Sequence, residues 1–264
     1  MGEGADVKAE RVLRFEILGP VQVLGADGQE VPLGPPQQRA VLAVLLLQEG
    51  RSISYDALVD AVWGSQPPRH VRNLVQKYVS GLRRCLGDAV DLTWTGGGYR
   101  LAGARIDDLG ERRSLVDRAI AARDAGDLPA AAELIQRAEE LWRGDFAEGL
   151  RAPYLEAERQ RWAEKRVTVQ EERLAGEIAH GRSFEQVHEL IRLIAAHPLR
   201  ERPVELLMHA LYRTGRSSEA LAAYEATRHR LAEALGADPG PTLRALHARI
   251  LRQDEDLLAG VGVR

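Results

Sequence analysis

Short runs of alternating apolar residues come first along the chain, and longer patterns of helical period follow them. The runs "RFEILG", "VQVLG" and "QEVPLG" are separated by Gly, Pro and the turn-forming "ADGQ", which predicts a small antiparallel meander. The segment "PPQQRAVLAVLLLQEG" begins with two prolines and closes at Gly50, the usual limits of a helix. The stretch "SISYDALVDAVWG" then predicts an extended piece and a compact helix ending at Gly64, with Ser54 or Asp56 as its cap.

Residues 69–87, "RHVRNLVQKYVSGLRRCLG", form a third helical pattern with one apolar and one polar face. At about 100° per residue, the stripe that we expect to face the core comprises Val71, Leu74, Val75, Tyr78, Leu82, Cys85 and Leu86. The opposite face carries only hydrogen-bond donors, namely Arg69, Asn73, Gln76, Lys77, Ser80 and Arg84, with Arg72 and Arg83 on its flank. No Asp or Glu occurs from 61 to 87, whereas exposed helices usually mix both charges to form i,i+4 pairs. This face therefore favours an anionic partner over the alternative of a solvated helix surface.

The sequence "DLTWTGGGYRLAG" at 91–103 has two β-type runs around three glycines, which predicts a hairpin. A strand meander, three helices and a terminal hairpin predict a winged helix-turn-helix, whose third helix enters the major groove while the hairpin forms the wing. We expect the most exposed side chains to read base edges, and the remaining cations to bind phosphates. The first group is Asn73, Gln76, Lys77 and Ser80, and the second is Arg69, Arg72, Arg83 and Arg84.

Other side chains near this face have alternative interpretations. In the wing, we expect Arg100 to reach a phosphate or the minor groove, and Thr93 or Thr95 to donate to the DNA backbone. Trp94 either packs against the hairpin or contacts DNA. Arg39, near the start of the first helix, either holds a phosphate or lies on the surface.

From about residue 106 the strand patterns stop, and the sequence becomes rich in Ala, Leu, Glu and Arg. Gly181 and Gly215 are 34 residues apart, the period of a tetratricopeptide repeat. The small Ala220 and the aromatic Tyr224 follow Gly215 in the rhythm of that repeat, and a weaker copy surrounds Gly126. We therefore expect stacked helix pairs, with a plain helical bundle as the alternative because most consensus aromatic residues are missing.

Positive charge is concentrated in the first third of a chain whose formal net charge is −3. Residues 11–104 hold ten Lys or Arg and eight Asp or Glu, whereas residues 106–264 carry a net charge of −4. The longest apolar run, "AVLAVLLL", is too short to cross a bilayer, and the acidic N-terminus is unlike a signal peptide. We expect a cytoplasmic, nucleoid-associated protein without a membrane partner, in which Cys85 is a buried structural thiol.

No pattern typical of an enzyme occurs in the sequence, so we expect neither catalysis nor a cofactor or metal. The seven histidines lack HExxH or zinc-ligand spacing, and no P-loop or GxGxxG motif follows a predicted strand. A protein-interaction scaffold of helical repeats is a third possibility. It would explain the second half of the chain but not the basic helix.

The segments above, taken together, resemble one protein family. "FEILGPVQV", "GPPQQRAVLAVLLL", "VQKYVSGLRRCLG", "GGGYRL", "LWRGD" and "HPLRERPVELLMHALYRTGRSSEALAAYEATRHRLAEALGADPGPTLRALHARIL" are similar to Streptomyces antibiotic regulatory proteins (SARPs). These join an OmpR/PhoB-type winged helix to a bacterial transcriptional activation domain. The resemblance covers nearly all of residues 13–252, and implies either a small family member or the N-terminal part of a larger one.

The resemblance implies a transcriptional activator of an antibiotic gene cluster, which binds direct repeats in promoter double-stranded DNA and recruits RNA polymerase holoenzyme. We also expect a second copy of the chain on DNA. The connector "GSQPP" lies where the OmpR/PhoB type can touch polymerase, so Ser65 and Gln66 are candidate contacts, with a stiff connector as the alternative. The expected fold is mainly α with a small β component. Its expected parts are a disordered N-terminus at 1–11, a winged helix at 12–104, a tetratricopeptide-like activation domain at 105–253 and a flexible tail at 254–264.

Overall fold

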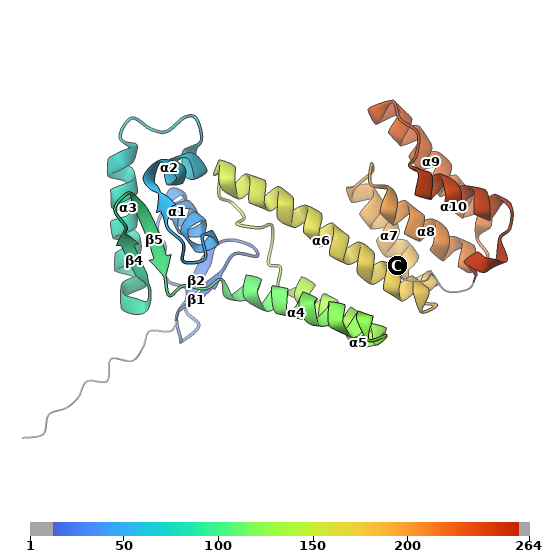
Figure 1. The fold of residues 1–264 in the computed structure, drawn as a ribbon, viewed down its shortest axis with the longest axis horizontal. Helices are drawn as coiled ribbons and strands as arrows, with labels where there is room; N and C mark the ends of the chain where they lie inside the picture. The colour runs from blue at the N-terminus through green and yellow to red at the C-terminus, as the bar shows by residue number, and fades with distance from the viewer. Residues whose placement is uncertain (1–12, 259–264) are drawn as a thin grey trace, which may run out of the picture. The chain divides into compact units, whose positions relative to one another are not determined.

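The computed structural model describes residues 13–258, which form two compact units (Figure 1). The first unit comprises the chain up to residue 117 together with 136–165, and the second comprises 118–135 together with the chain from 166 onward. The chain passes between the units within three helices, α4 (Asp107–Asp124), α5 (Leu128–Glu140) and α6 (Pro153–Ala179). The predicted disordered N-terminus and the last six residues of the predicted tail lie outside the described residues.

The strands of the first unit form two small antiparallel sheets. They are β1 (Arg14–Glu16), β2 (Gln22–Leu24), β3 (Ile53–Ser54), β4 (Asp91–Trp94) and β5 (Gly98–Ala102). β1 pairs with β2, and β5 lies between β3 and β4. The third run of the predicted meander forms no strand, and adds only an isolated bridge between Glu30 and Leu24. Pro32 follows two residues later and has no N–H to donate, which prevents the ladder from continuing.

Three helices complete the predicted winged helix-turn-helix, namely α1 (Pro36–Leu47), α2 (Tyr55–Trp63) and α3 (Val71–Leu86). Ser54, rather than Asp56, caps α2, because its side chain accepts a hydrogen bond from the Ala57 amide at 3.2 Å. The hairpin of β4 and β5 lies beside α3 (Figure 1). The predicted fold class is therefore confirmed.

The core of the first unit is built around α1, whose residues 40–46 are all at most 4% exposed. This helix packs on α2, α3 and β5. The same core also contains side chains from residues 136–165, among them Phe146, Leu150, Leu155 and Trp162. The compact unit therefore does not end at the predicted boundary of residue 104, because apolar side chains well beyond that boundary complete its core.

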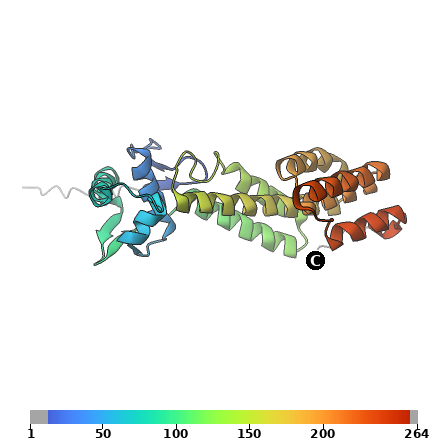
Figure 2. The same ribbon diagram turned by 90° about the horizontal axis from the view of Figure 1, so that it is seen from above.

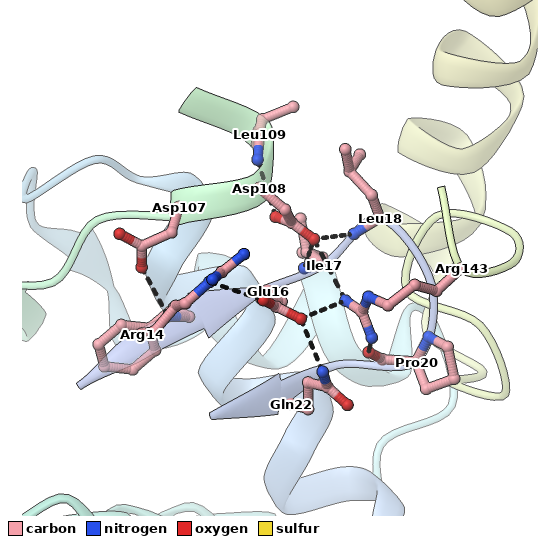
Figure 3. A network of polar contacts seen from close by, with 11 residues as sticks. Arg14, Glu16, Ile17, Leu18, Pro20, Gln22, Asp107, Asp108, Leu109 and Arg143 are labelled. Atoms are coloured by element: carbon pink, nitrogen blue, oxygen red, sulfur yellow. Dashed lines mark hydrogen bonds and ion pairs between the residues drawn. The ribbon is translucent and has the colours of Figure 1, made fainter. Parts of the chain in front are cut away.

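A buried carboxylate ties the start of α4 to β1 (Figure 3). Asp108 Oδ2 accepts hydrogen bonds from the amides of Ile17 and Leu18, both at 2.8 Å. Arg143 donates to the same oxygen at 3.2 Å and pairs with Glu16, also at 3.2 Å. Burial raises the pKa of Asp108, although the hydrogen bonds from Leu18, Ile17 and Arg143 oppose that shift. This network links segments about 90 residues apart, so the first unit depends on contacts that the predicted 12–104 domain lacks.

The second unit continues from α6 as a stack of helices, shown in orange and red in Figures 1 and 2. They are α7 (Ser183–Ala196), α8 (Glu201–Arg213), α9 (Ser217–Leu235) and α10 (Pro241–Leu251). α7 packs on α8, α8 packs on α9, and α10 contacts both α8 and α9. Each helix therefore buries its apolar side against the next, as in a repeat array.

Glycines in left-handed conformation end the first helix of each pair. Gly126, Gly181 and Gly215 have φ of +81°, +84° and +77°, which residues with a Cβ rarely adopt. Ala220 and Tyr224 are both buried in the core of the second unit. The turn positions and the small-then-aromatic rhythm predicted from the sequence are therefore confirmed.

The second unit extends beyond the predicted boundary at residue 253. A 3-10 helix spans Glu255–Leu257, and Leu257 is buried in the core. The Tyr212 hydroxyl donates to the Asp254 carbonyl at 3.2 Å. Within the predicted tail, an apolar side chain and a hydrogen bond thus connect residues 254–258 to the second unit. Within residues 13–258, no helix has both the length and the apolar character needed to cross a membrane.

Candidate nucleic-acid interface

Helix α3 faces the core through Val75, Val79, Leu82 and Leu86. These positions recur at helical spacing, and α3 packs on α1 through this side. The predicted stripe omitted Val79 and included four residues that are only partly buried, namely Val71, Leu74, Tyr78 and Cys85. The Cys85 thiol donates to the Leu82 carbonyl at 3.4 Å, so it is a half-buried structural thiol rather than a fully buried one.

Gly81 allows α1 and α3 to approach each other closely. A Cβ at this position would lie 2.5 Å from Gln38 Oε1 and 2.9 Å from its Cδ. Gln38 is itself buried and fixed, because its amide donates to the Leu33 carbonyl at 2.9 Å. Glycine inside a helix costs about 1 kcal/mol relative to alanine, and here the close contact explains its presence.

The outward face of α3 is polar and cationic along its whole length. Its exposed side chains are Arg72, Asn73, Gln76, Lys77, Ser80, Arg83 and Arg84. None of the five cations from Arg69 to Arg84 forms an ion pair with any residue in 13–258. A helix surface of unpaired cations interleaved with Asn and Gln has the donors that bind phosphate oxygens and base edges.

Arg69 was predicted on this helix but lies just before it. Helix α3 begins at Val71, and the Val71 amide donates to the Pro68 carbonyl at 2.9 Å. His70 occupies the N-cap position without a side-chain hydrogen bond. The Arg69 side chain is exposed in the turn, so it remains available to a ligand near the helix N-terminus.

The three glycines of the predicted hairpin have different roles. Gly96 has φ of +78°, and the Thr95 amide donates to the Gly98 carbonyl at 2.9 Å to close the turn. At Gly98 a Cβ would lie 1.9 Å from the Ile53 carbonyl oxygen, because β3 and β5 pair directly there. Only Gly98 is therefore fixed by close packing of two backbones.

Arg83 joins the recognition helix to the wing. Its Nε donates to the Leu92 carbonyl in β4 at 2.8 Å. Burial raises the pKa of the Tyr99 phenol in β5, and the nearby Arg83 and Arg72 lower it, so Tyr99 stays neutral at physiological pH. Arg83 was predicted only as a phosphate ligand, and no local sequence pattern indicates that it also positions the wing.

The wing side chains divide between packing and exposure. Trp94 is 50% exposed, and its ring meets that of the buried Tyr99 edge to face at 4.9 Å. The Thr95 hydroxyl shares a hydrogen bond with Ser52 at 2.6 Å. Arg100 is exposed and lies 3.6 Å from Asp91, a long ion pair in solvent. The structure thus leaves Arg100 and half of the Trp94 surface accessible, while Thr95 already has a partner.

Three predicted residues lie away from the wing. Arg39 on α1 is partly buried, and its Nε has no hydrogen-bond partner within the described part of the chain. Ser65 and Gln66 are both exposed in the connector between α2 and α3.

No cluster of three or more His, Cys, Asp or Glu side chains suited to a metal ion occurs among residues 13–258.

Comparison with known proteins assigns this architecture to a family. Residues 108–251 match the bacterial transcriptional activator domain, and residues 28–101 match the C-terminal domain of transcriptional regulatory proteins. The regulatory protein AfsR of Streptomyces coelicolor is 45% identical over 258 residues, which are 97% of this chain and 26% of AfsR. The transcriptional regulator RedD of the same species is 34% identical over 255 residues, 92% of this chain and 71% of RedD. The chain belongs to the Streptomyces antibiotic regulatory protein family.

A solved structure supports the assignment of this SARP. EmbR of Mycobacterium tuberculosis, in complex with a low-affinity phosphopeptide, superposes with a TM-score of 0.85 and 39% sequence identity. The match covers 92% of this chain and 66% of the EmbR chain. The chain spans about a quarter of the length of AfsR. The family and its named members are transcriptional regulators, in agreement with the predicted DNA-binding regulator.

Proposed function

We propose that this SARP activates a secondary-metabolite gene cluster, by binding direct repeats near its promoter and recruiting RNA polymerase holoenzyme. The observation that carries the proposal is the exposed face of α3 together with Arg69 just before it. None of the five cations there forms an ion pair with an acidic side chain of residues 13–258. Unpaired cations on a helix in this position are what a winged helix needs to bind the major groove.

The roles of individual residues follow from their places on α3 and the wing. Asn73, Gln76, Lys77 and Ser80 read base edges, since they lie on one exposed line of the helix. Arg69, Arg72 and Arg84 bind phosphates on either side of that line, and Arg83 holds the wing as it does so. Arg100 reaches a phosphate or the minor groove from the wing. Arg39 and Thr95 have weaker support, because one is partly buried and the other is already hydrogen-bonded.

A second copy is needed for tight promoter occupancy. A single winged helix buries only about 600–1,000 Å² of protein surface on DNA, at the low end for specific binding. Two copies on repeats one or two helical turns apart would occupy the same face of the duplex. Direct repeats therefore allow a modest interface to act cooperatively.

Polymerase recruitment is assigned to the connector between α2 and α3. Ser65 and Gln66 are exposed there, and the prolines at 67 and 68 restrict the backbone that presents them. Neither side chain forms a hydrogen bond within the described residues. They are therefore free to bind a protein surface beside the duplex without loss of intramolecular contacts.

The experiment begins with chromatin immunoprecipitation and sequencing of the full chain, which gives the sites, their spacing and the genes. Gel shifts with one-repeat and two-repeat duplexes from those sites then measure cooperativity, and transcription in vitro with polymerase holoenzyme measures activation. The double variant Ser65→Ala/Gln66→Ala should bind DNA normally and lose activation, whereas Arg100→Ala should weaken both. Sites without paired repeats, or full activation by the connector variant, would contradict the respective part of the proposal.

A further inference from the structure

The outer side of α7 carries an unusual row of exposed side chains for a helix within a repeat array. Phe184 is 67% exposed and Ile191 is 49% exposed, and both lie on one stripe with the exposed His188 and Ala195. The opposite side of α7 is buried through Val187, Leu190, Leu193 and Ile194, and packs on α8. Fully solvated helices rarely expose two large apolar side chains one above the other.

The neighbouring repeat provides an internal reference for this surface. Gly181 and Gly215 begin equivalent turns 34 residues apart, so Phe184 corresponds to Ser218 in α9, and Ile191 corresponds to Glu225. Ser218 and Glu225 are exposed and polar, as expected for an outer helix in water. The apolar residues of α7 are therefore not required by the repeat itself.

Two charges beside the stripe indicate what covers it. Glu185 and Arg192 are exposed, seven residues apart on the same flank of α7, and neither forms an ion pair with a residue in 13–258. In an antiparallel pair of identical helices, like flanks face each other across a two-fold axis. Glu185 of each copy would then lie opposite Arg192 of the other, which gives two equivalent ion pairs. In the same pairing Phe184 lies near the small Ala195 of the second copy, so the apolar stripe and the charges are both self-complementary.

We infer that two copies of this chain associate through the α7 surface, defined by Phe184, Glu185, His188, Ile191 and Arg192. This inference rests on the proposed function, since it assigns a contact surface to the proposed second copy. Helix α7 has 14 residues and is therefore about 21 Å long, so the contact is small. A weak dimer that forms at high local concentration, as on adjacent repeats, is the expected result.

The test uses sedimentation of the full chain from about 1 to 100 µM, the range in which weak dimers dissociate. The wild-type mass should rise toward that of a dimer. Phe184→Ser/Ile191→Glu, which installs the residues of the neighbouring repeat, should remain a monomer with unchanged helical circular dichroism. Leu235→Ser is the matched control, because Leu235 is 62% exposed on α9 outside this surface and should not affect the mass.

Charge reversal tests the geometry of the pairing. Glu185→Arg and Arg192→Glu should each raise the dissociation constant about tenfold or more, and the double reversal should restore the wild-type value. A monomer at all concentrations, or a double reversal that stays weak, would overturn the inference. Loss of activation without any change in mass would show that a different protein binds here, and would also overturn it. Binding to a one-repeat duplex is measured in parallel, because its failure would count against the proposed function rather than against this surface.

Discussion

The arginines of α3 and those at α9 all reach solvent but differ in their charged neighbours. On α9 and just before it, Arg228 and Arg216 pair with glutamates three residues away, at 2.9 Å and 2.7 Å. Helix α3 contains no acidic residue, and Arg72 and Arg84 form no ion pair within residues 13–258. A paired arginine is satisfied within the chain, whereas an unpaired one remains available to an external anion. The difference indicates that the absence of acids, rather than the presence of arginines, distinguishes α3 as the helix that we propose to bind DNA.

A third environment completes this comparison. Arg143 is partly buried between Glu16 and Asp108, in the network that ties α4 to β1 (Figure 3). We therefore expect arginine to act in stability at Arg143, to contribute little on α9, and to act in DNA binding on α3. Each role can be tested separately, because a different measurement responds in each case.

The largest effect is expected for the buried network. Asp108→Ala removes the acceptor of two backbone amides and of Arg143, so the free energy of unfolding of the first unit should fall by roughly 3–5 kcal/mol. The neighbouring Asp107 accepts one hydrogen bond, from the Phe15 amide at 2.7 Å, and Asp107→Ala should cost about 1 kcal/mol. Denaturant unfolding followed by tryptophan fluorescence reports on this unit. Equal losses for the two variants would show that the network is not what holds α4 in place.

The two units should also respond differently to acid. Burial, with the nearby Arg202, Arg249 and Arg213, lowers the pKa of His209 on α8 from 6.5 to about 4. Between pH 6.5 and 4, His209 therefore binds a proton in the unfolded chain but not in the folded one. The free energy of unfolding of the second unit should fall by up to about 3 kcal/mol over this range.

Hydrogen exchange of the α8 amides measures this loss of stability, and His209→Gln should reduce its dependence on pH. Asp108 acts in the opposite direction, because its pKa is raised and its contribution to stability therefore grows as the pH falls. A second unit whose stability did not change between pH 6.5 and 4 would rule out a buried neutral His209.

Base reading should be separable from phosphate binding on α3. Gln76→Ala and Asn73→Ala should each reduce the free energy of DNA binding by roughly 1–3 kcal/mol at particular base pairs, because each side chain hydrogen-bonds to the edge of a specific base. Arg84→Ala should weaken all duplexes to a similar degree, since phosphates occur at every position. A panel of duplexes with single base changes, measured by fluorescence anisotropy, distinguishes the two patterns. Identical profiles for Gln76 and Arg84 would mean that the division of roles is wrong.

The smallest effect is expected for the exposed pairs of α9. Arg228→Ala should change the free energy of unfolding by only about 0.3–0.5 kcal/mol, because the pair with Glu225 is solvated. It should leave DNA affinity unchanged. Thermal unfolding and anisotropy together check both statements. A clear loss of DNA affinity would place α9 at the duplex and would contradict the expectation that its paired arginines do not bind DNA.

Local patterns in the sequence were sufficient to predict much of the fold and the acid-free face of the candidate site. The acid-free face of α3, the glycines of the hairpin and the turn at Gly215 each depend on residues close together in the chain, so periodicity and composition predict them. The absence of a third meander strand depends on Pro32, a local feature that is visible in the sequence. The sequence leaves Ser54 and Asp56 as alternative caps of α2, because both side chains can accept a hydrogen bond from a backbone amide at the start of the helix.

Contacts between distant segments were beyond such reasoning. Nothing near Asp108 indicates that its carboxylate accepts the amides of Ile17 and Leu18, and nothing near Trp162 indicates that it completes the winged-helix core. The bond from Arg83 to the Leu92 carbonyl crosses from helix to wing and has no sequence signature. These contacts require the three-dimensional arrangement of the chain, which explains why the compact unit includes residues beyond the predicted winged-helix boundary at residue 104.

The salt dependence of DNA affinity tests the central claim most directly. Wild-type protein, Arg72→Ala/Arg84→Ala on α3 and Arg216→Ala/Arg228→Ala at α9 are titrated with one duplex from low to moderate salt. Each lost phosphate contact reduces the slope of log K against log salt concentration by about one, so the α3 variant should lose about two and the α9 variant none. The same slope for all three proteins would contradict the claim that the unpaired cations of α3 meet the DNA backbone.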